Sequence, residues 1–208
     1  SHSSSQLMLE WLSGFAGPRG WLEKERVLDY GCGSGILGLA ALKLGARSLV
    51  GVDLNRTALK ATRANAELNG LSENVELRLP PEEGRDRDFD DFFGDFEETW
   101  HQEAATSGTG DFPSLPLGQH GDLRFGCVLA NMRKNALLRC ASKLVGLCKV
   151  NGVVAVSGFM MDFEERAVVT AFRAAGLQCQ VCLDSSSVDG MGDFRATGGY
   201  GMFWGHRR

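Results

Sequence analysis

The sequence predicts one α/β domain, a doubly wound, mostly parallel sheet of seven strands with helices on both faces. Strand-like and helix-like segments alternate along the chain, and repeated βα units of this kind build parallel sheets. A glycine-rich turn follows the first strand, at the place where such folds bind ligands. The 208 residues are 43% hydrophobic and 23% charged, which suits a single globular domain with a large core.

The elements follow from hydrophobic periodicity and from stop signals. Gly45, Gly70 and Gly176 each follow an apolar helical pattern and end it. Short runs rich in Val, Leu and Phe, bounded by polar or glycine residues, are expected to be strands. The expected strands are 26–30, 48–53, 75–79, 125–130, 152–157, 177–183 and 200–204. The expected helices are 36–44, a helix capped by Asn55 or Thr57 that runs to Asn69, 135–147 and 161–175.

A long segment between the third and fourth strands interrupts this alternation. Residues 82–98 contain nine acidic residues and two arginines, and a stretch with glycines and prolines follows. We expect an acidic, flexible insertion at about 81–121 on the surface of the domain. Aromatic residues three or four positions apart within it also allow a short amphipathic helix that binds a partner or gates the substrate. These residues are Phe89, Phe92, Phe93, Phe96 and Trp100.

Composition excludes several classes of protein. No apolar run approaches the ~20 residues that span a bilayer, and residues 1–5 do not form a secretory signal. We therefore expect a cytoplasmic protein without a membrane partner, or an organellar one if a targeting segment was trimmed. A net charge of −4 gives no reason to expect direct nucleic-acid binding.

The six cysteines are expected to be reduced and mostly buried, because they fall in apolar segments of a chain without an export signal. Cys179 and Cys182 form a CxxC, but they lie in an expected strand. Strand residues three apart point to opposite faces, and no second CxxC completes a site. We therefore expect no metal.

The turn from Gly31 to Gly35 predicts a ligand that contains adenosine. Three alternating glycines between a strand and a helix present backbone N–H groups and a helix N-terminus to a ligand. Residues 33–38 also fit G-x-G-x-x-G, a weak signal when it stands alone. Asp53 ends the second strand about twenty residues later, where a carboxylate can accept both hydroxyls of a ribose.

Asp29 favours S-adenosylmethionine (SAM) as that ligand. It lies two residues before Gly31, where the pyrophosphate of a dinucleotide would be repelled by a carboxylate. SAM carries an ammonium and a sulfonium instead, and a carboxylate attracts both. A capping or turn role is the alternative for Asp29. The sequence also lacks a P-loop, a YxxxK, an HExxH and a GxSxG motif.

Ten segments outside and around this loop are typical of one enzyme family. The Leu-Pro pair after the third strand and the Ala-Asn pair after the fourth are not general methyltransferase features. The segments are His2–Ser5, Leu9–Leu12, Leu28–Leu37, Ala40–Ala46, Gly51–Leu54, Asn65–Ala66, Asn69–Gly70, Leu77–Pro80, Val128–Asn131 and Ser157–Gly158. On these residues the chain resembles the catalytic domain of the ribosomal protein L11 methyltransferase (PrmA) family, class I SAM-dependent methyltransferases with a Rossmann-like fold. The insertion and about the last twenty residues lie outside the resemblance.

The resemblance implies a role for each matching site residue. Ser5 replaces a threonine whose hydroxyl contacts SAM, Gly31 lies under the methionine moiety, and Asp53 binds the ribose. Asn131 lies beside both the cofactor and the methyl acceptor and is the candidate catalytic residue; a helix N-cap is its alternative role. Motif and resemblance together predict cofactor binding by Ser5, Asp29, Gly31, Gly33, Gly35, Asp53, Leu54 and Asn131.

The activity implied is methylation of lysine or N-terminal amino groups of a protein, with L11 as the first candidate and S-adenosylhomocysteine (SAH) as product. Asn131 is followed by Met132 and not by Pro-Pro-Tyr, which argues against enzymes that modify adenine or glutamine. The family's N-terminal recognition domain is absent from these residues, so another protein lysine, a small molecule or RNA stays open as acceptor. Two functions of other classes stay open as alternatives: a non-catalytic SAM-binding module and a nicotinamide-dependent oxidoreductase. The oligomeric state is not predicted.

A lysine acceptor must lose a proton before it attacks. With a free pKa of about 10.4, neutralising it at pH 7 costs about 4.6 kcal/mol. Desolvation and a nearby sulfonium both lower that pKa, so a strong base is not required. None is evident, since His2 is the only histidine near a motif. We expect Asn131 to orient the amine through its carbonyl oxygen, and residues 185–199 to form a loop or hairpin near the acceptor.

Overall fold

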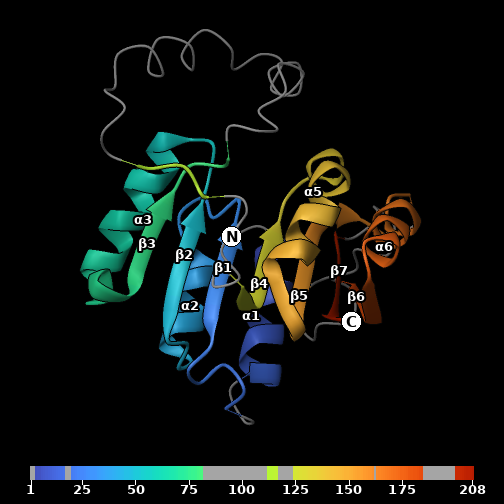
Figure 1. Cartoon of the computed structure of the whole chain (residues 1–208), viewed down its shortest axis with the longest axis horizontal. Coiled ribbons are helices and arrows are strands. Elements are labelled where there is room, and N and C mark those ends of the chain that lie inside the picture. Colours follow the sequence, from blue (N-terminus) through green and yellow to red (C-terminus); the bar gives the residue numbers. More distant parts are fainter. Residues whose placement is uncertain (1–2, 17–19, 82–111, 117–123, 162, 185–199) are drawn as a thin grey trace, which may run out of the picture.

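The computed structural model describes residues 3–16, 20–81, 112–116, 124–161, 163–184 and 200–208, which form an α/β domain around one seven-stranded sheet (Figure 1). The strand order is β3-β2-β1-β4-β5-β7-β6. Every neighbouring pair is parallel except the two pairs that β7 makes with β5 and β6. The strands are β1 Arg26–Tyr30, β2 Ser48–Val52, β3 Val75–Arg78, β4 Phe125–Asn131, β5 Cys148–Met160, β6 Leu177–Asp184 and β7 Tyr200–Arg207. The predicted fold class is confirmed.

The sheet carries helices on both faces, as a doubly wound sheet requires. Helices α5 and α6 cover one core cluster, which includes Leu28 and Val128, and α1 and α2 cover a second, which includes Val27 and Cys127. Neighbouring strand residues therefore point to different cores, and both cores are apolar. The helices are α1 Ser3–Trp11, α2 Ile36–Lys43, α3 Arg56–Leu68, α5 Lys134–Leu147 and α6 Glu165–Ala174, with short π- and 3₁₀-helical segments at Leu12–Ala16 and Ser72–Asn74.

Three elements, β5, α6 and β7, differ from the sequence prediction by three or more residues at an end, and helix α1 was not predicted. Strand β7 continues beyond the predicted 204 to Arg207. Strand β5 extends beyond 152–157 in both directions, because Cys148 pairs with Phe125 of β4 and the pairing with β7 continues to Met160 opposite Tyr200. Helix α6 consequently begins at Glu165, four residues later than the predicted 161. Helix α3 begins as expected, and Asn55 is its cap, since its side chain accepts the backbone N–H of Thr57 at 2.8 Å.

Part of the segment expected to be an insertion packs on the domain. Phe112 is 2% exposed in a cluster with Leu59, Leu77 and Leu79. The N–H of Leu79 donates to the carbonyl of Pro113 at 3.0 Å, and the N–H of Leu115 donates to the carbonyl of Leu79 at 2.8 Å. Residues 112–116 therefore pack against the end of β3 and pair with the residue after it through one isolated parallel bridge, Leu79 to Ser114. The aromatic helix expected at 89–100 and the loop expected at 185–199 lie outside the described residues.

The cysteines of the described side chains are free thiols. Cys32, Cys127, Cys140 and Cys148 are buried, and Cys179 is half-buried. Burial raises the pKa of the Cys148 thiol to about 12, so it stays protonated and unreactive at neutral pH. No cluster of three metal-binding side chains occurs in the described ranges, and no helix there is long and apolar enough to cross a membrane.

Candidate functional site

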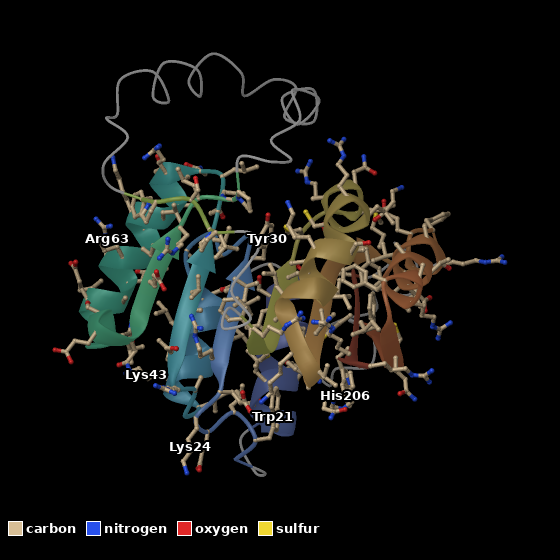
Figure 2. The ribbon with its side chains drawn as sticks, in the orientation of Figure 1. Trp21, Lys24, Tyr30, Lys43, Arg63 and His206 are labelled. Atoms are coloured by element: carbon tan, nitrogen blue, oxygen red, sulfur yellow. The ribbon has the colours of Figure 1, made fainter. Side chains whose placement is uncertain are left out.

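The candidate site lies at the carboxyl edge of the parallel strands, where β1, β2 and β4 end. Figure 2 marks this edge with Tyr30, the last residue of β1, and marks the opposite edge with Trp21 and Lys24. The loop after β1 is attached to the neighbouring strand, because the N–H groups of Gly31 and Cys32 donate to the carbonyl of Val52 at 2.7 and 3.0 Å. The glycine loop is therefore fixed above the β1–β2 pair.

The three alternating glycines of this loop all adopt positive φ, at 80°, 55° and 80° for Gly31, Gly33 and Gly35. At Gly33 the absence of a side chain matters for a ligand: a Cβ there would meet nothing within 4 Å. The backbone of Gly33 thus faces open space at the sheet edge. This is the arrangement by which a backbone approaches a bound ligand closely.

Asp53 holds the loop in this position from the end of β2. Its Oδ2 accepts the N–H of Gly33 at 2.9 Å, and its Oδ1 accepts the N–H of Asn55 at 2.9 Å. Burial raises the pKa of the Asp53 carboxyl, and the N–H bonds from Asn55 and Gly33 oppose that rise. Each carboxylate oxygen has a second lone pair, so Asp53 can still accept two hydroxyl groups. Leu54, 40% exposed, adds apolar surface directly beside it.

Helix α3 contributes contacts to the loop that the sequence analysis did not predict. Thr62 is fully buried, and its hydroxyl donates to the carbonyl of Gly33 at 2.8 Å. Asn65 donates from Nδ2 to the carbonyl of Ser34 at 2.9 Å. The sequence did hold one sign of the Thr62 contact: Thr62 lies between Leu59 and Ala66, as a polar residue on the apolar face of an amphipathic helix.

Replacing Thr62 by valine is expected to lower the free energy of unfolding by about 1–2 kcal/mol, because the Gly33 carbonyl loses a buried partner while the volume is kept. Urea unfolding followed by circular dichroism measures this loss. Thr170→Val on the exposed face of α6 is the matched control and should change the midpoint little. Equal losses in both variants would show that helix propensity, and not the bond to Gly33, is responsible.

Asp29 performs the capping role that the sequence analysis gave as its alternative. It is 2% exposed, and its Oδ2 accepts the N–H of Gly38, in the first turn of α2, at 2.9 Å. The residue at the N-cap of α2 is Gly35, which has no side chain to do this. Burial raises the pKa of the Asp29 carboxyl to about 7; the Gly38 bond lowers it and the nearby charge of Asp53 raises it further.

Asn131 and Ser5 meet although they are 126 residues apart in the chain. Asn131 ends β4, and Ser5 lies in the first turn of α1. The Nδ2 of Asn131 donates to the Oγ of Ser5 at 3.0 Å. With its N–H₂ group used in this way, the amide keeps its carbonyl oxygen Oδ1 as an acceptor. The structure thus brings together the two residues that the resemblance places beside the cofactor.

The site residues predicted from the sequence thus gather along one edge. The glycine loop, Asp53 and Leu54 lie above β1 and β2, and Asn131 with Ser5 lies at the adjacent end of β4. Met132 connects the two groups, because its Cγ lies 2.8 Å from where a Cβ of Gly31 would be. A hollow of about 320 Å³ borders the loop at Ser34, with Leu9, Ile36 and Asn65 also in its wall, and it includes neither Asp53 nor Asn131.

Comparison with known sequences matches the first part of the chain to one family. Residues 1–92 match the family "Ribosomal protein L11 methyltransferase (PrmA)". A ribosomal protein L11 methyltransferase of Aeromonas hydrophila is 44% identical over 90 residues, 43% of this chain and 29% of that protein. The Pectobacterium atrosepticum enzyme is 45% identical over 86 residues, 41% of this chain and 28% of that protein. The chain therefore spans less than a third of these relatives. The predicted resemblance is confirmed for residues 1–92, a range that ends before Asn131 and Ser157–Gly158.

Comparison with solved structures covers the whole chain and shows the class I methyltransferase fold. A ribosomal protein L11 methylase from Lactobacillus delbrueckii subsp. bulgaricus has a TM-score of 0.64 at 21% identity and covers 100% of this chain and 81% of its own. A Burkholderia thailandensis N-methyltransferase that holds SAH has a TM-score of 0.60 at 16% identity, with 97% and 77% coverage.

Proposed function

We propose that this chain is the catalytic part of a SAM-dependent methyltransferase that acts on amino groups of a protein. The observation that carries the proposal is the pairing of Asp53 with the N–H of Gly33, at the same edge of the sheet at which Asn131 ends β4. It presents a carboxylate with spare lone pairs and an open glycine backbone within one fixed loop. The family match through residue 92 includes both of these residues.

The residues present fit SAM part by part. Asp53 would accept the ribose hydroxyls, and the exposed side chain of Leu54 would cover the adenine. Gly31, Gly33 and Gly35 would line the methionine moiety, and Asp29 below them would attract its ammonium and sulfonium. SAM supplies an electrophilic methyl group when it is bound, so the protein has mainly to align an acceptor with it. The open space at Gly33 and the acceptor capacity of Asp53 are the observations that support this fit.

Asn131 would bind and orient the acceptor amine. Its Oδ1 can accept an N–H of a neutral amine while Ser5 holds its Nδ2. The histidine in the described part of the chain is His206, which pairs with Val153 of β5. Asn131 pairs with Ser157, four residues further along the same strand. That is about 13 Å along the strand, too far for direct proton transfer. Desolvation and the cationic cofactor would both lower the pKa of the amine and so promote its loss of a proton.

We propose ribosomal protein L11 as the first acceptor to test, because the matching relatives carry that name. The protein, incubated with L11 and SAM tritiated in the methyl group, is expected to transfer label to L11, located by mass spectrometry on lysine or the N-terminal amine. Total RNA in a parallel reaction tests the alternative acceptor class. Label in RNA alone would replace the proposed acceptor. The absence of label from both, with intact SAH binding, would refute methylation of L11 and of RNA alike.

Replacing Asp53 by asparagine is expected to weaken SAH binding about tenfold or more, because charge-assisted bonds to the ribose and the hold on Gly33 are both lost. Isothermal titration calorimetry measures the dissociation constant. Glu73→Gln, which removes one exposed negative charge before β3, is the matched control and should bind as the unchanged protein does. Equal affinity in the Asp53 variant would remove Asp53 from the site.

A further inference from the structure

Gly158 lies against the candidate catalytic residue. It follows Ser157, which is level with Asn131 in the β4–β5 register. Its φ is 95°, and a Cβ there would lie 2.5 Å from the carbonyl oxygen of Met132 and 2.9 Å from Oδ1 of Asn131. Both distances are shorter than real Cβ contacts, and the nearer atom belongs to the backbone, which cannot yield by rotation of a side chain.

The strand is irregular at this point. The pairing of β5 with β7 shifts register between Ser157 and Phe159, so Gly158 lies at a β-bulge. The residues on either side of the contact are held in place, because the N–H of Met132 donates to the carbonyl of Ser157 at 3.1 Å and the hydroxyl of Ser157 donates to the carbonyl of Gly201 at 2.8 Å. Bulges of this kind redirect side chains beside active sites.

A second glycine bounds the same turn from the other side. The Cγ and Sδ of Met132 lie 2.8 and 3.0 Å from the position of a Cβ on Gly31. The Asn131–Met132 turn is thus enclosed between Gly158 of β5 and Gly31 of the cofactor loop. Neither glycine has a side chain, so the turn can lie close both to strand β5 and to the glycine loop.

We propose that Gly158 is a positioning residue for Asn131, and that Gly158 and Gly31 together clamp the Asn131–Met132 turn so that Oδ1 of Asn131 faces the acceptor amine. This rests on the proposed function for the identity of the acceptor group. A methyl group at position 158 would displace the Met132 carbonyl, the Asn131 amide or both. A misplacement of this kind costs about 10- to 10²-fold in the rate of the chemical step.

The test compares Gly158→Ala with Gly176→Ala. Gly176 has the same φ of 95°, and a Cβ there would meet nothing within 4 Å. Both variants therefore carry the same kind of backbone strain, and only Gly158→Ala presses on Asn131. With tritiated SAM and L11, Gly158→Ala is expected to lose about tenfold or more in kcat with SAH affinity kept, whereas Gly176→Ala keeps its kcat. An unchanged kcat in Gly158→Ala, or equal losses in both variants, would overturn the proposal.

A readout without an acceptor separates failure of the clamp from failure of the proposed function. The side-chain amide signals of Asn131, assigned by their loss in Asn131→Ala, are followed by ¹⁵N nuclear magnetic resonance. They are expected to shift in Gly158→Ala and to stay in place in Gly176→Ala, whether or not L11 is methylated. Unshifted signals in Gly158→Ala would overturn the clamp. If the signals shift in Gly158→Ala but the protein without substitutions does not methylate L11, only the proposed acceptor is overturned.

Should Gly158→Ala not fold, Met132→Ala tests the clamp from the side of Gly31 and leaves β5 unchanged. It is expected to shift the same amide signals, because the turn loses the contact that holds it toward the loop. Amide signals identical to those of the unchanged protein would overturn the proposal.

Discussion

Replacing Asn131 by alanine is expected to lower turnover by about 10²-fold and to weaken SAH binding only a few-fold, because the lost carbonyl orients the acceptor and not the cofactor. The amide is fixed by its bond to Ser5, so its Oδ1 is directed before the acceptor arrives. Loss of that direction leaves the amine free to rotate, and the in-line geometry of methyl transfer becomes rare. Steady-state kinetics with tritiated SAM and L11 measures the change.

Two further variants separate orientation from other causes. Asn74→Ala removes a comparable side-chain bond, from Nδ2 to the carbonyl of Arg47 at 3.2 Å, before β3 and away from the site. It should turn over normally. Ser5→Ala removes the partner that holds the Asn131 amide and should fall between the two. Full turnover in Asn131→Ala would remove the role assigned to this residue.

Replacing Asp29 by asparagine is expected to stabilise the protein at pH 8 and to weaken SAM binding. The folded state raises the pKa of the Asp29 carboxyl to about 7 from an ordinary value near 4, mainly through burial. Between these values the folded state holds a proton that the unfolded state has released, so stability falls as the pH rises from about 4 to about 7. At ~1.36 kcal/mol for each pKa unit, the cost of the buried charge reaches ~4 kcal/mol at most above pH 7.

Asparagine avoids this cost, since it is neutral and its Oδ1 can still accept the N–H of Gly38. Urea unfolding should therefore show the variant more stable than the unchanged protein at pH 8 and nearly equal to it at pH 4. Calorimetry at pH 8 should show SAM bound about tenfold more weakly or worse, because its cations lose a charged partner. A variant less stable at pH 8, or one with unchanged affinity for SAM, would contradict the role given to Asp29.

The order of strands and helices could be predicted because each strand here carries a local signal, a short apolar run with a glycine or polar end. The ends of β5 could not, for two local reasons. Asn151, directly before the predicted strand, favours a turn, and it does adopt a φ of 61°. Gly158 reads as the end of a strand, whereas the strand continues past it through a bulge to Met160. At the first end, pairing of Cys148 with Phe125 of β4 outweighs the local preference, and at the second end pairing with β7 does.

Helix α1 and the segment around Phe112 depend on contacts that are distant in sequence. The serines at 3–5 are modest helix formers, and α1 is held by burial of Leu7, Met8 and Trp11. Phe112 is buried between α3 and β3, with the guanidinium of Arg63 4.5 Å from the centre of its ring. Nothing in the residues next to Phe112 indicates this partner.

The positions of the candidate site residues were predictable where a glycine or a carboxylate follows a predicted strand. Gly31, Gly33, Gly35 and Asp53 lie as expected along one edge, and the resemblance brought in Ser5 and Asn131, which the structure joins by a hydrogen bond. Thr62 and Gly158 were missed as site residues. Each acts on the site through one close contact from a neighbouring element, and such contacts leave no periodic pattern in the sequence.

We propose above all that the edge formed by the glycine loop and Asp53 binds SAM. Isothermal titration calorimetry of the unchanged protein with SAH, and with NAD as a second ligand, tests it most directly. We expect SAH to bind in the micromolar range, Asp53→Asn to lose most of that affinity, and NAD not to bind. Binding of NAD without SAH, or SAH binding that is indifferent to Asp53, would contradict it.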